Sequence, residues 1–470
     1  MLIKLEKFVF TFASFVFLHL TIFMKKRTFT LLISFTFLQI TLAQKTSYKF
    51  DFGTTKPAKG YIAVNKNTIY TPKQGYGFLK TDAIIQDIES KNSKKPFNTF
   101  TTADKPFFFS VNLPEGNYDV KILLGGEGSS LTTVKVENRR LMLEKIKTPG
   151  LIQGDAEGPL AEVKFTVHIR NAAINNSKDS VKLKPRERSY FHWDNQLTFE
   201  FCDSLPKIAA LEISPNTTAT TLFLAGNSTV VDQNLEPYAA WGQMIPCFFT
   251  PLSIVVANHA ESGESLRSFI SEKRLDKVMS MLKKGDYLFI EFAHNDQKQK
   301  DLRPFVEYKD LLKKYIKTTR EKGGKPVLVT SMHRRSFDSL GKIINTLGDF
   351  PEAMRQTAQE ENVPLIDLNA MSKTLWEALG TEGSKKAFVH IPAHTFPNQD
   401  KAIEDDTHFS NYGAYLLALC MVEGIKQNIP ELCPFLKFDT PPFDPSVPLP
   451  YDGFHFPKGI YAPIVKPDGN

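Results

Sequence analysis

The chain has 470 residues, a length at which two hydrophobic cores are more usual than one. Hydrophobic residues make up 42% and charged residues 23%, proportions that are ordinary for a globular protein and exclude global disorder. The net charge of +7 is modest for this length, and no block of Lys and Arg is long enough for a nucleic-acid-binding arm. We therefore expect no nucleic-acid partner.

The segment 1–44 has the composition of a targeting sequence. Two apolar runs, 8–23 and 28–43, lie on either side of a basic stretch that begins at Met24. The basic stretch and the second run are typical of a secretory signal, so we expect Met24 to be the true start. The competing interpretation is a membrane hairpin, but each run is shorter than the roughly 20 residues of a spanning helix. We expect export to the periplasm, cell surface or medium, with no stable membrane span after signal cleavage.

The four cysteines show no metal-binding spacing. They form no CxxC pair and no Cys/His cluster, so neither a structural zinc site nor any other metal site is predicted. Cys420 lies in an apolar helical pattern, which predicts a buried thiol. The other three are Cys202, Cys247 and Cys433.

Residues 45–210 are expected to form an all-β sandwich domain. Short alternating or aromatic-rich runs recur there, separated by turn sequences, and no amphipathic helix interrupts them. The predicted strands are 48–52, 107–111, 118–124, 132–136, 162–169 and 197–201.

Residues 215–430 are expected to form an α/β domain, and 431–470 a tail packed on its surface. Continuously apolar strands alternate there with helical patterns, as in a parallel sheet covered on both faces. The predicted strands are 220–225, 253–257, 286–292, 326–331 and 363–368, and the predicted helices are 265–283, 304–322, 350–361 and 410–428.

Polar residues follow the strands of this second domain, where open α/β sheets collect their functional groups. Ser228 stands in a glycine turn, and a loop glycine, Gly263, can bring a backbone N–H close to a reacting group. An amide such as Asn295 can stabilise an oxyanion. Asp405 precedes His408 by three residues and can hold its Nδ1–H, which leaves Nε2 to act as a base. Taken singly, each is better explained as an ordinary turn or helix cap.

Three motifs follow one another along this half of the chain: Asn258-x-Ala260-x-x-Gly263-x-Ser265, Phe292-x-His294-Asn295-Asp296 and Asp405-x-Thr407-His408-Phe409-Ser410. In this order, after the turn of Ser228, they resemble those of the SGNH (GDSL-type) hydrolases, and within them the rhamnogalacturonan acetylesterase branch. The resemblance implies a flavodoxin-like domain with a parallel sheet between helices. It also implies a serine esterase that removes acetyl groups from plant cell-wall polysaccharide, with pectin or rhamnogalacturonan as substrate.

The resemblance also implies residue roles. Ser228 is the nucleophile, His408 the general base and Asp405 the residue that orients His408. The oxyanion hole consists of the backbone N–H groups of Ser228 and Gly263 and the side chain of Asn295. No metal or organic cofactor is needed for this chemistry.

Two positions depart from the family pattern. Asn227 stands where Asp is usual beside the nucleophile, and Ala293 stands where Gly is usual before His-Asn-Asp. Neither exchange removes a catalytic group, so activity is expected to survive, with an altered pH response from Asn227.

A galacturonate-containing substrate calls for a cationic subsite. Arg267, Arg334 and Arg335 are the candidates, because arginine binds carboxylates bidentately; surface salt bridges explain each of them equally well. We favour Arg334 and Arg335, which follow the strand 326–331. The expected partner is an acetylated polysaccharide or oligosaccharide.

The N-terminal region resembles a galactose-binding-like sandwich, on the strength of Asp51-Phe52-Gly53 and the strand pattern. Its role stays open between glycan targeting and shielding of the second domain. Alternatives for the whole chain are a non-catalytic carbohydrate-binding protein, an SGNH acyltransferase, or an esterase for another acetylated glycan. Retention of Ser228, Asp405 and His408 together argues against the first. No apolar lid segment lies near the motifs, which argues against a lipase.

Overall fold

The computed structural model of the protein describes residues 45–90, 97–148, 160–396 and 399–457. The expected signal sequence lies outside these residues. By its contacts, the chain from Gln44 onward is one compact unit. Among the described residues, no helix combines the length and apolar character that crossing a membrane requires.

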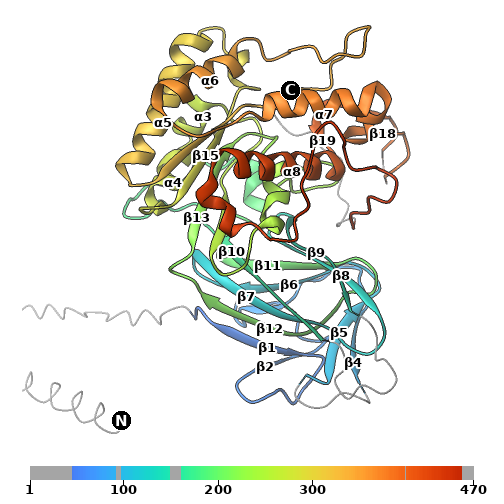
Figure 1. The fold of residues 1–470 in the computed structure, drawn as a ribbon. Coiled ribbons are helices and arrows are strands. Elements are labelled where there is room, and N and C mark those ends of the chain that lie inside the picture. Colours follow the sequence, from blue (N-terminus) through green and yellow to red (C-terminus); the bar gives the residue numbers. More distant parts are fainter. Residues whose placement is uncertain (1–44, 91–96, 149–159, 397–398, 458–470) are drawn as a thin grey trace, which may run out of the picture. The chain divides into compact units, whose positions relative to one another are not determined.

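Strands β1–β12 form a sandwich of two sheets (Figure 1). One sheet has the order β10-β7-β12-β1-β2, with β5 and β4 attached at β12, and the other has the order β3-β6-β11-β8-β9. Aromatic rings fill the space between them: Phe109 of β6 lies 5.2 Å from Phe50 and 5.1 Å from Phe52 of β1, between ring centres. The strands are β1 (Tyr48–Phe52), β2 (Ile62–Val64), β3 (Tyr76–Phe78), β4 (Ile85–Glu89), β5 (Thr99–Ala103), β6 (Phe107–Asn112), β7 (Gly116–Gly125), β8 (Ser130–Val136), β9 (Arg140–Thr148), β10 (Leu160–Ile169), β11 (Gln196–Cys202) and β12 (Lys207–Pro215).

The predicted end of the sandwich at residue 210 is wrong. Strand β12, which was not predicted, runs to Pro215 and pairs with both β1 and β7, so it is the middle strand of the first sheet. The prediction also omitted β2, β3, β4, β5 and β9. Strands β2 and β3 have three residues each, too few to show an alternating pattern.

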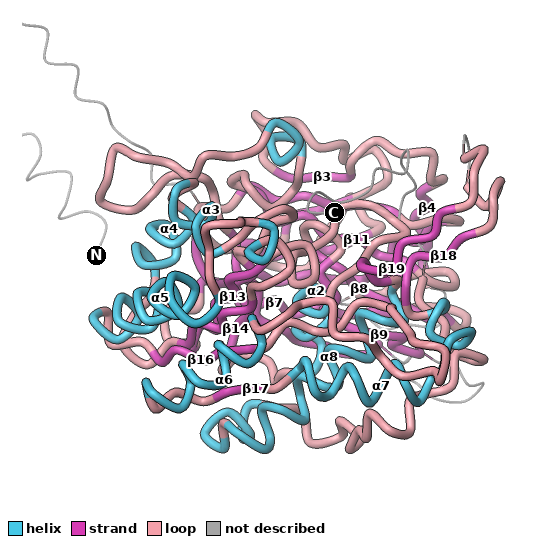
Figure 2. Tube along the Cα trace, turned by 90° about the horizontal axis from the view of Figure 1, so that it is seen from above, coloured by secondary structure: helices cyan, strands magenta, loops and turns pink. Residues whose placement is uncertain are grey.

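The second half of the chain contains a five-stranded parallel sheet of order β14-β13-β15-β16-β17 (Figures 1 and 2). In chain order this is 2-1-3-4-5, the order of doubly wound sheets of the flavodoxin kind. Adjacent residues of β13 face opposite cores: Leu222 packs with α2, α7 and α8, whereas Phe223 packs with α3, α4, α5 and α6. The strands are β13 (Thr220–Gly226), β14 (Ile254–Asn258), β15 (Tyr287–Glu291), β16 (Lys325–Val329) and β17 (Leu365–Ile366). The helices are α2 (Trp241–Met244), α3 (Leu266–Ser271), α4 (Arg274–Met281), α5 (Lys309–Glu321), α6 (Phe350–Glu361), α7 (Leu368–Gly383) and α8 (Asn411–Asn428).

Several predicted elements of this half have different bounds. The helix expected at 265–283 is divided into α3 and α4, because Lys273 between them has a left-handed φ of 62°. Helix α5 begins at Lys309, after a π-helical turn. Helix α7 was not predicted, nor was the antiparallel hairpin of β18 (Phe388–Ile391) and β19 (Ile403–Phe409).

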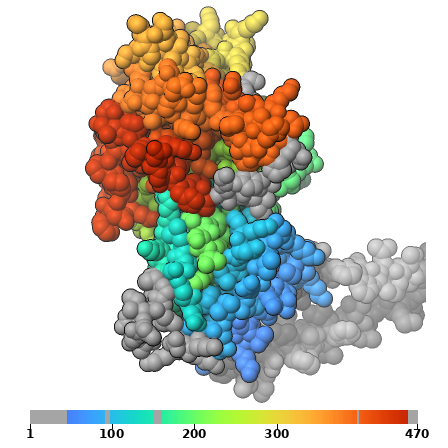
Figure 3. All heavy atoms as spheres, turned by 90° about the vertical axis from the view of Figure 1, so that its right-hand side faces the viewer, coloured from blue at the N-terminus to red at the C-terminus, as the bar shows by residue number. Residues whose placement is uncertain are grey.

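The C-terminal segment is more than a surface tail. Leu432, Phe443 and Phe456 are buried and belong to the same hydrophobic core as α8. In Figure 3 this segment and α8 together form the red region, and within it the ring of Phe454 lies 5.2 Å from that of Tyr412 in α8, between ring centres. The prediction that residues 431–470 only cover the surface is therefore wrong, because side chains between Leu432 and Phe456 belong to the core. All four cysteines are free thiols, and Cys420 is buried, as predicted.

Candidate active site

The structure brings Ser228, His408 and Asp405 into one chain of hydrogen bonds. Ser228 Oγ lies 2.9 Å from His408 Nε2, and His408 Nδ1 lies 2.8 Å from Asp405 Oδ2. The three residues are 4%, 1% and 2% exposed. This order of hydroxyl, imidazole and carboxylate is the one in which a serine is activated as a nucleophile.

Ser228 is presented by a tight turn at the end of β13. A Cβ at Gly226 would lie 2.5 Å from Val230 Cγ2, so glycine is required where the chain turns. The side chain of Asn227 closes the turn, because its Oδ1 accepts from the backbone N–H (3.0 Å) and the hydroxyl (2.8 Å) of Thr229. An acceptor is all that this contact needs, which explains how Asn replaces the usual Asp here.

A β-bulge presents His408. Phe388 of β18 pairs with Phe409 and Val389 pairs with Asp405, so the residues between Asp405 and Phe409 have no partner in β18. Bulges of this kind redirect side chains beside active sites. The ring of Tyr238 packs against the His408 ring at 5.8 Å and 89°. The sequence prediction placed this motif at the end of a parallel strand, and its position in an antiparallel hairpin corrects that expectation.

Asp405 is held as a carboxylate. Its Oδ1 accepts the backbone N–H groups of Thr407 (2.9 Å) and His408 (3.0 Å). Burial raises the pKa of Asp405, but the hydrogen bond and charge of His408 and these two N–H groups outweigh burial and lower the pKa to about 2. Asp405 is therefore charged at any pH near neutrality and can stabilise a protonated His408.

The expected oxyanion donors come from loops after three adjacent strands, β13, β14 and β15. The Glu261 N–H donates to Gly226 O at 3.2 Å, which joins the glycine loop to the turn of Ser228. Within the described residues, the backbone N–H groups of Ser228 and Gly263 donate to no protein acceptor. Asn295 Nδ2 donates to Glu264 O at 2.9 Å, so one of its two amide hydrogens is engaged.

The three candidate arginines have different surroundings. Arg267 pairs with Asp301 at 2.7 Å and Arg335 pairs with Asp406 at 2.9 Å. Arg334 has no carboxylate partner among the residues that the structure describes, and it donates to Thr346 Oγ1 at 3.2 Å. Burial lowers its pKa, with an opposing effect from Asp405. Of the three candidates, Arg334 is thus the one that no carboxylate of the described residues neutralises by a direct ion pair.

Sequence reasoning missed a buried carboxylate beneath the nucleophile turn. Glu291 accepts hydrogen bonds from Ser331 (2.5 Å), Thr229 (3.1 Å) and Trp241 (3.3 Å). Burial raises its pKa, and these bonds oppose the rise. A glutamate at the end of an otherwise apolar strand was the available signal, because such a residue needs buried partners.

One buried group in the described part of the chain has the spacing of a metal site: Glu187, His192 and Glu261. His192 Nδ1 lies 3.0 Å from the Asn138 Nδ2 amide, whose Oδ1 accepts from Phe191 N. His192 Nδ1 is therefore an acceptor and Nε2 carries the proton, so the ring has no lone pair for an ion at Nε2. These residues favour a charge network over a metal site.

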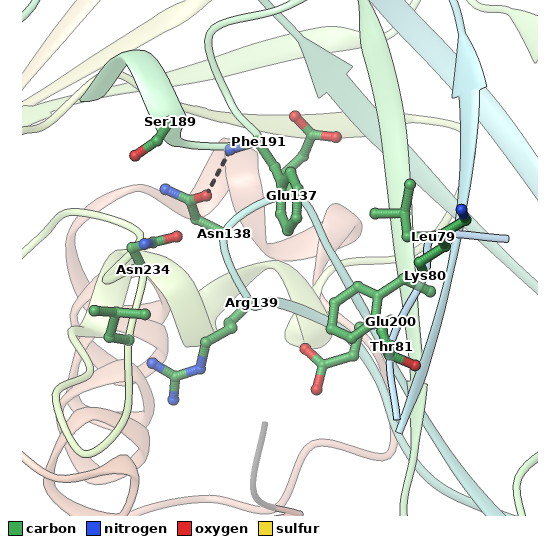
Figure 4. Close-up of a pocket in the computed structure, with 12 residues that line it drawn as sticks. Leu79, Lys80, Thr81, Glu137, Asn138, Arg139, Ser189, Phe191, Glu200 and Asn234 are labelled. Atoms are coloured by element: carbon green, nitrogen blue, oxygen red, sulfur yellow. Dashed lines mark hydrogen bonds between the residues drawn. The ribbon is translucent and has the colours of Figure 1, made fainter. Parts of the chain in front are cut away.

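A cavity of about 260 Å³ lies apart from the triad (Figure 4). Lys80, Glu137, Phe191 and Asn234 line it, and none of the triad residues does. Arg139, also at its wall, donates to Tyr238 O at 2.9 Å and pairs with Glu236 at 2.5 Å. Because no residue of the triad lines this cavity, we do not place the reaction there.

Asp296 provides a prediction about pH and stability. It is fully buried, its Oδ1 accepts the Leu266 N–H at 2.9 Å, and burial raises its pKa from 3.8 to about 7. Because the pKa of this carboxyl is higher in the folded than in the unfolded chain, its contribution to the free energy of unfolding is complete below pH 4 and is lost as the pH rises through 7. The wild type should therefore lose about 3–5 kcal/mol of unfolding free energy between pH 4 and 8, and Asp296→Asn, which keeps the acceptor but cannot ionise, should not show this loss. Urea unfolding at both pH values measures the difference. Equal losses in wild type and variant would contradict the prediction.

Comparison with known proteins places the chain in a family. The family model described as "Beta-agarase/YXIM esterase-like, galactose-binding domain-like" matches residues 48–146. RhgT of Bacillus subtilis (strain 168), a rhamnogalacturonan acetylesterase, is 45% identical over 208 residues, which are 44% of this chain and 89% of RhgT. The probable rhamnogalacturonan acetylesterase YesY of the same strain is 37% identical over 44% of this chain and 94% of YesY. The uncharacterized esterase YxiM of that strain is 26% identical over 82% of this chain and 92% of YxiM. The chain belongs to the rhamnogalacturonan acetylesterase family and is a carboxylic ester hydrolase.

Proposed function

We propose that this protein removes acetyl groups from acetylated rhamnogalacturonan, the pectic backbone that contains galacturonate, with Ser228, His408 and Asp405 as its triad. The observation that carries the proposal is the unbroken chain of hydrogen bonds from Ser228 Oγ through His408 to Asp405, at 2.9 and 2.8 Å. We also propose, on the signal expected before residue 44, that the reaction takes place outside the cytoplasm.

The chemistry proceeds in two steps. Ser228 Oγ attacks the acetyl carbonyl while His408 Nε2 accepts the hydroxyl proton, and that proton passes to the departing sugar oxygen as the C–O bond breaks. Water then attacks the acetyl-enzyme with His408 as base, which releases acetate and restores Ser228. In both steps the negative carbonyl oxygen is stabilised by the N–H groups of Ser228 and Gly263 and by the Asn295 amide.

The substrate class rests on the named relatives and on Arg334. RhgT is a rhamnogalacturonan acetylesterase, and YesY is a probable one. In this chain Arg334 donates to Thr346 and lies within the electrostatic influence of Asp405. A guanidinium in this position suits the galacturonate carboxylate of a bound chain.

Acetate release from acetylated rhamnogalacturonan, with acetylated xylan as the comparison, tests the substrate. We expect release mainly from the pectic polymer. Release mainly from xylan would keep the esterase chemistry and overturn the substrate, whereas release from neither would overturn the proposed function.

Arg334→Met is expected to weaken binding of the anionic substrate. Loss of a charged partner should raise KM for acetylated rhamnogalacturonan about tenfold, and KM for the neutral p-nitrophenyl acetate should change little. Arg267→Met is the matched control, because Arg267 is already paired with Asp301. An equal rise of KM for both substrates would show that Arg334 does not bind the carboxylate.

A further inference from the structure

The peptide group between Ser262 and Gly263 has two faces with different partners. Its N–H belongs to Gly263 and is one of the proposed oxyanion donors. Its carbonyl oxygen, on Ser262, accepts from Lys184 Nζ at 2.5 Å and from Arg186 Nη2 at 3.0 Å. Two cations are thus bound to the oxygen of the same peptide whose N–H must point at the reacting ester.

This peptide is the middle one of a four-residue turn. The Glu264 N–H donates to Glu261 O at 3.2 Å, and Gly263, third in the turn, has a φ of 84°. Positive φ at the third residue is the mark of a type II turn, and a type I turn differs from it by a flip of the middle peptide. Such a flip would turn the Gly263 N–H away from the ester and toward Lys184 and Arg186. The two cations would then face a donor in place of an acceptor, so they disfavour the flipped turn.

Carboxylates on both sides of the turn hold the cations in place. Lys184 Nζ lies 2.6 Å from Glu264 Oε1, and Arg186 Nη2 lies 2.7 Å from Glu261 Oε1. The side chains of Glu261 and Glu264 are 2% and 0% exposed. Because buried charge pairs are costly unless each charge is compensated, both cations are tied to this turn.

Lys184 and Arg186 belong to residues 170–195, which connect β10 with β11 of the sandwich and which we term the bridging segment. The segment is anchored on α4: Glu187 accepts from Arg274 Nη1 at 3.0 Å and Nη2 at 2.6 Å, and both side chains are fully buried. Trp193 Nε1 also donates to Glu187 at 2.8 Å. The two cations therefore extend from the start of a fixed short helix, Pro185–Ser189, with Lys184 as its N-cap and Arg186 in its first turn.

We propose that Lys184 and Arg186 are positioning residues of the esterase: they hold the Ser262–Gly263 peptide with its N–H in the oxyanion hole and polarise that N–H through its carbonyl. The proposal rests on the proposed function, in which Gly263 stabilises the oxyanion. It gives the N-terminal half of the chain a third role besides glycan targeting and shielding, because the bridging segment completes the active site of the α/β half.

The test compares charge-removing and charge-keeping variants on p-nitrophenyl acetate, a substrate that requires no polysaccharide binding. We expect Lys184→Met to lower kcat about 10–100-fold with little change in KM, which is less than the roughly 10²–10³-fold loss of a complete oxyanion donor. Lys184→Arg keeps a cation at the carbonyl and should stay within about threefold of wild type. Lys273→Met is the matched control: it removes the ion pair of Lys273, the residue before α4, with Asp179 of the bridging segment at 2.5 Å, and among the described residues Lys273 has no ion pair with the turn.

The outcomes separate this inference from the proposed function. If wild type hydrolyses the ester, Ser228→Ala does not, and Lys184→Met has the wild-type kcat, the inference is overturned and the esterase assignment stands. Equal losses of kcat and thermal stability in Lys184→Met and Lys273→Met would reduce Lys184 to a structural role and also overturn it. Should Lys184→Met fail to fold, Arg186→Gln takes its place, and a wild-type kcat in that variant overturns the inference. The Arg186 side chain is 30% exposed and glutamine keeps an N–H donor, so this variant should fold. An inactive wild type would overturn both.

Discussion

Ser228→Ala is expected to lower kcat for acetyl ester hydrolysis by about a million-fold, the scale seen when a triad nucleophile is removed. Without Oγ no acetyl-enzyme can form, and His408 Nε2 loses the hydroxyl that lies 2.9 Å from it. The oxyanion donors would remain, so slow hydrolysis above the rate in water is expected to persist. Acetate release or p-nitrophenol release measures the loss.

A matched serine variant controls for nonspecific effects. Ser253 is exposed and lies just before β14, at the opposite end of the sheet from the triad. Ser253→Ala should keep wild-type kcat, and both variants should unfold at the wild-type temperature. Ser228→Ala with more than about a thousandth of wild-type kcat would mean that another group is the nucleophile.

Asp405→Asn is expected to lower kcat about 10⁴-fold. The Oδ1 of the new amide can still accept from Thr407 and His408 N–H, so its NH₂ group would face His408 Nδ1. That contact makes Nδ1 an acceptor and places the imidazole proton on Nε2. Nε2 can then no longer accept the proton of Ser228. Steady-state kinetics with p-nitrophenyl acetate measure this effect.

The neighbouring aspartate is the control for this variant. Asp406 has a 48% exposed side chain and pairs with Arg335 at 2.9 Å. Asp406→Asn is expected to keep kcat within about tenfold of wild type, because a partly exposed pair contributes little. Equal kcat values for the two variants would contradict the role of Asp405.

The parallel sheet was predictable because its strands are buried on both faces and therefore continuously apolar, as in Tyr287–Glu291. The β18–β19 hairpin was not, since Ile403–Phe409 is rich in charged residues and contains a bulge that breaks alternation. Helix α7 did carry a signal, with Leu368, Leu375 and Trp376 buried at helical spacing. The predicted strand 363–368 included the first residue of this helix, Leu368, and no helix was predicted after it.

The triad residues were identified through the order of the motifs, and the structure brings all three together. The oxyanion loop shows why the rest could not be predicted. Lys184 lies 78 residues before Ser262, and no local pattern indicates that its ammonium group binds that carbonyl. Arg334 and Arg335 are adjacent in the sequence, yet Arg335 pairs with Asp406 while Arg334 has no carboxylate partner in the described part of the chain. Contacts made over such distances depend on packing, which one sequence does not reveal.

The most direct test of the triad is to locate the acetyl group on the enzyme during turnover. p-Nitrophenyl acetate has a good leaving group, so the wild-type enzyme should acetylate faster than water removes the acetyl group. Rapid acid quenching during turnover, followed by peptide mass mapping, should then find the acetyl group on the peptide that contains Ser228. We expect an acetyl ester on Ser228 that is absent from Ser228→Ala. Acetylation at another residue that persists in Ser228→Ala would contradict the role of Ser228 as nucleophile.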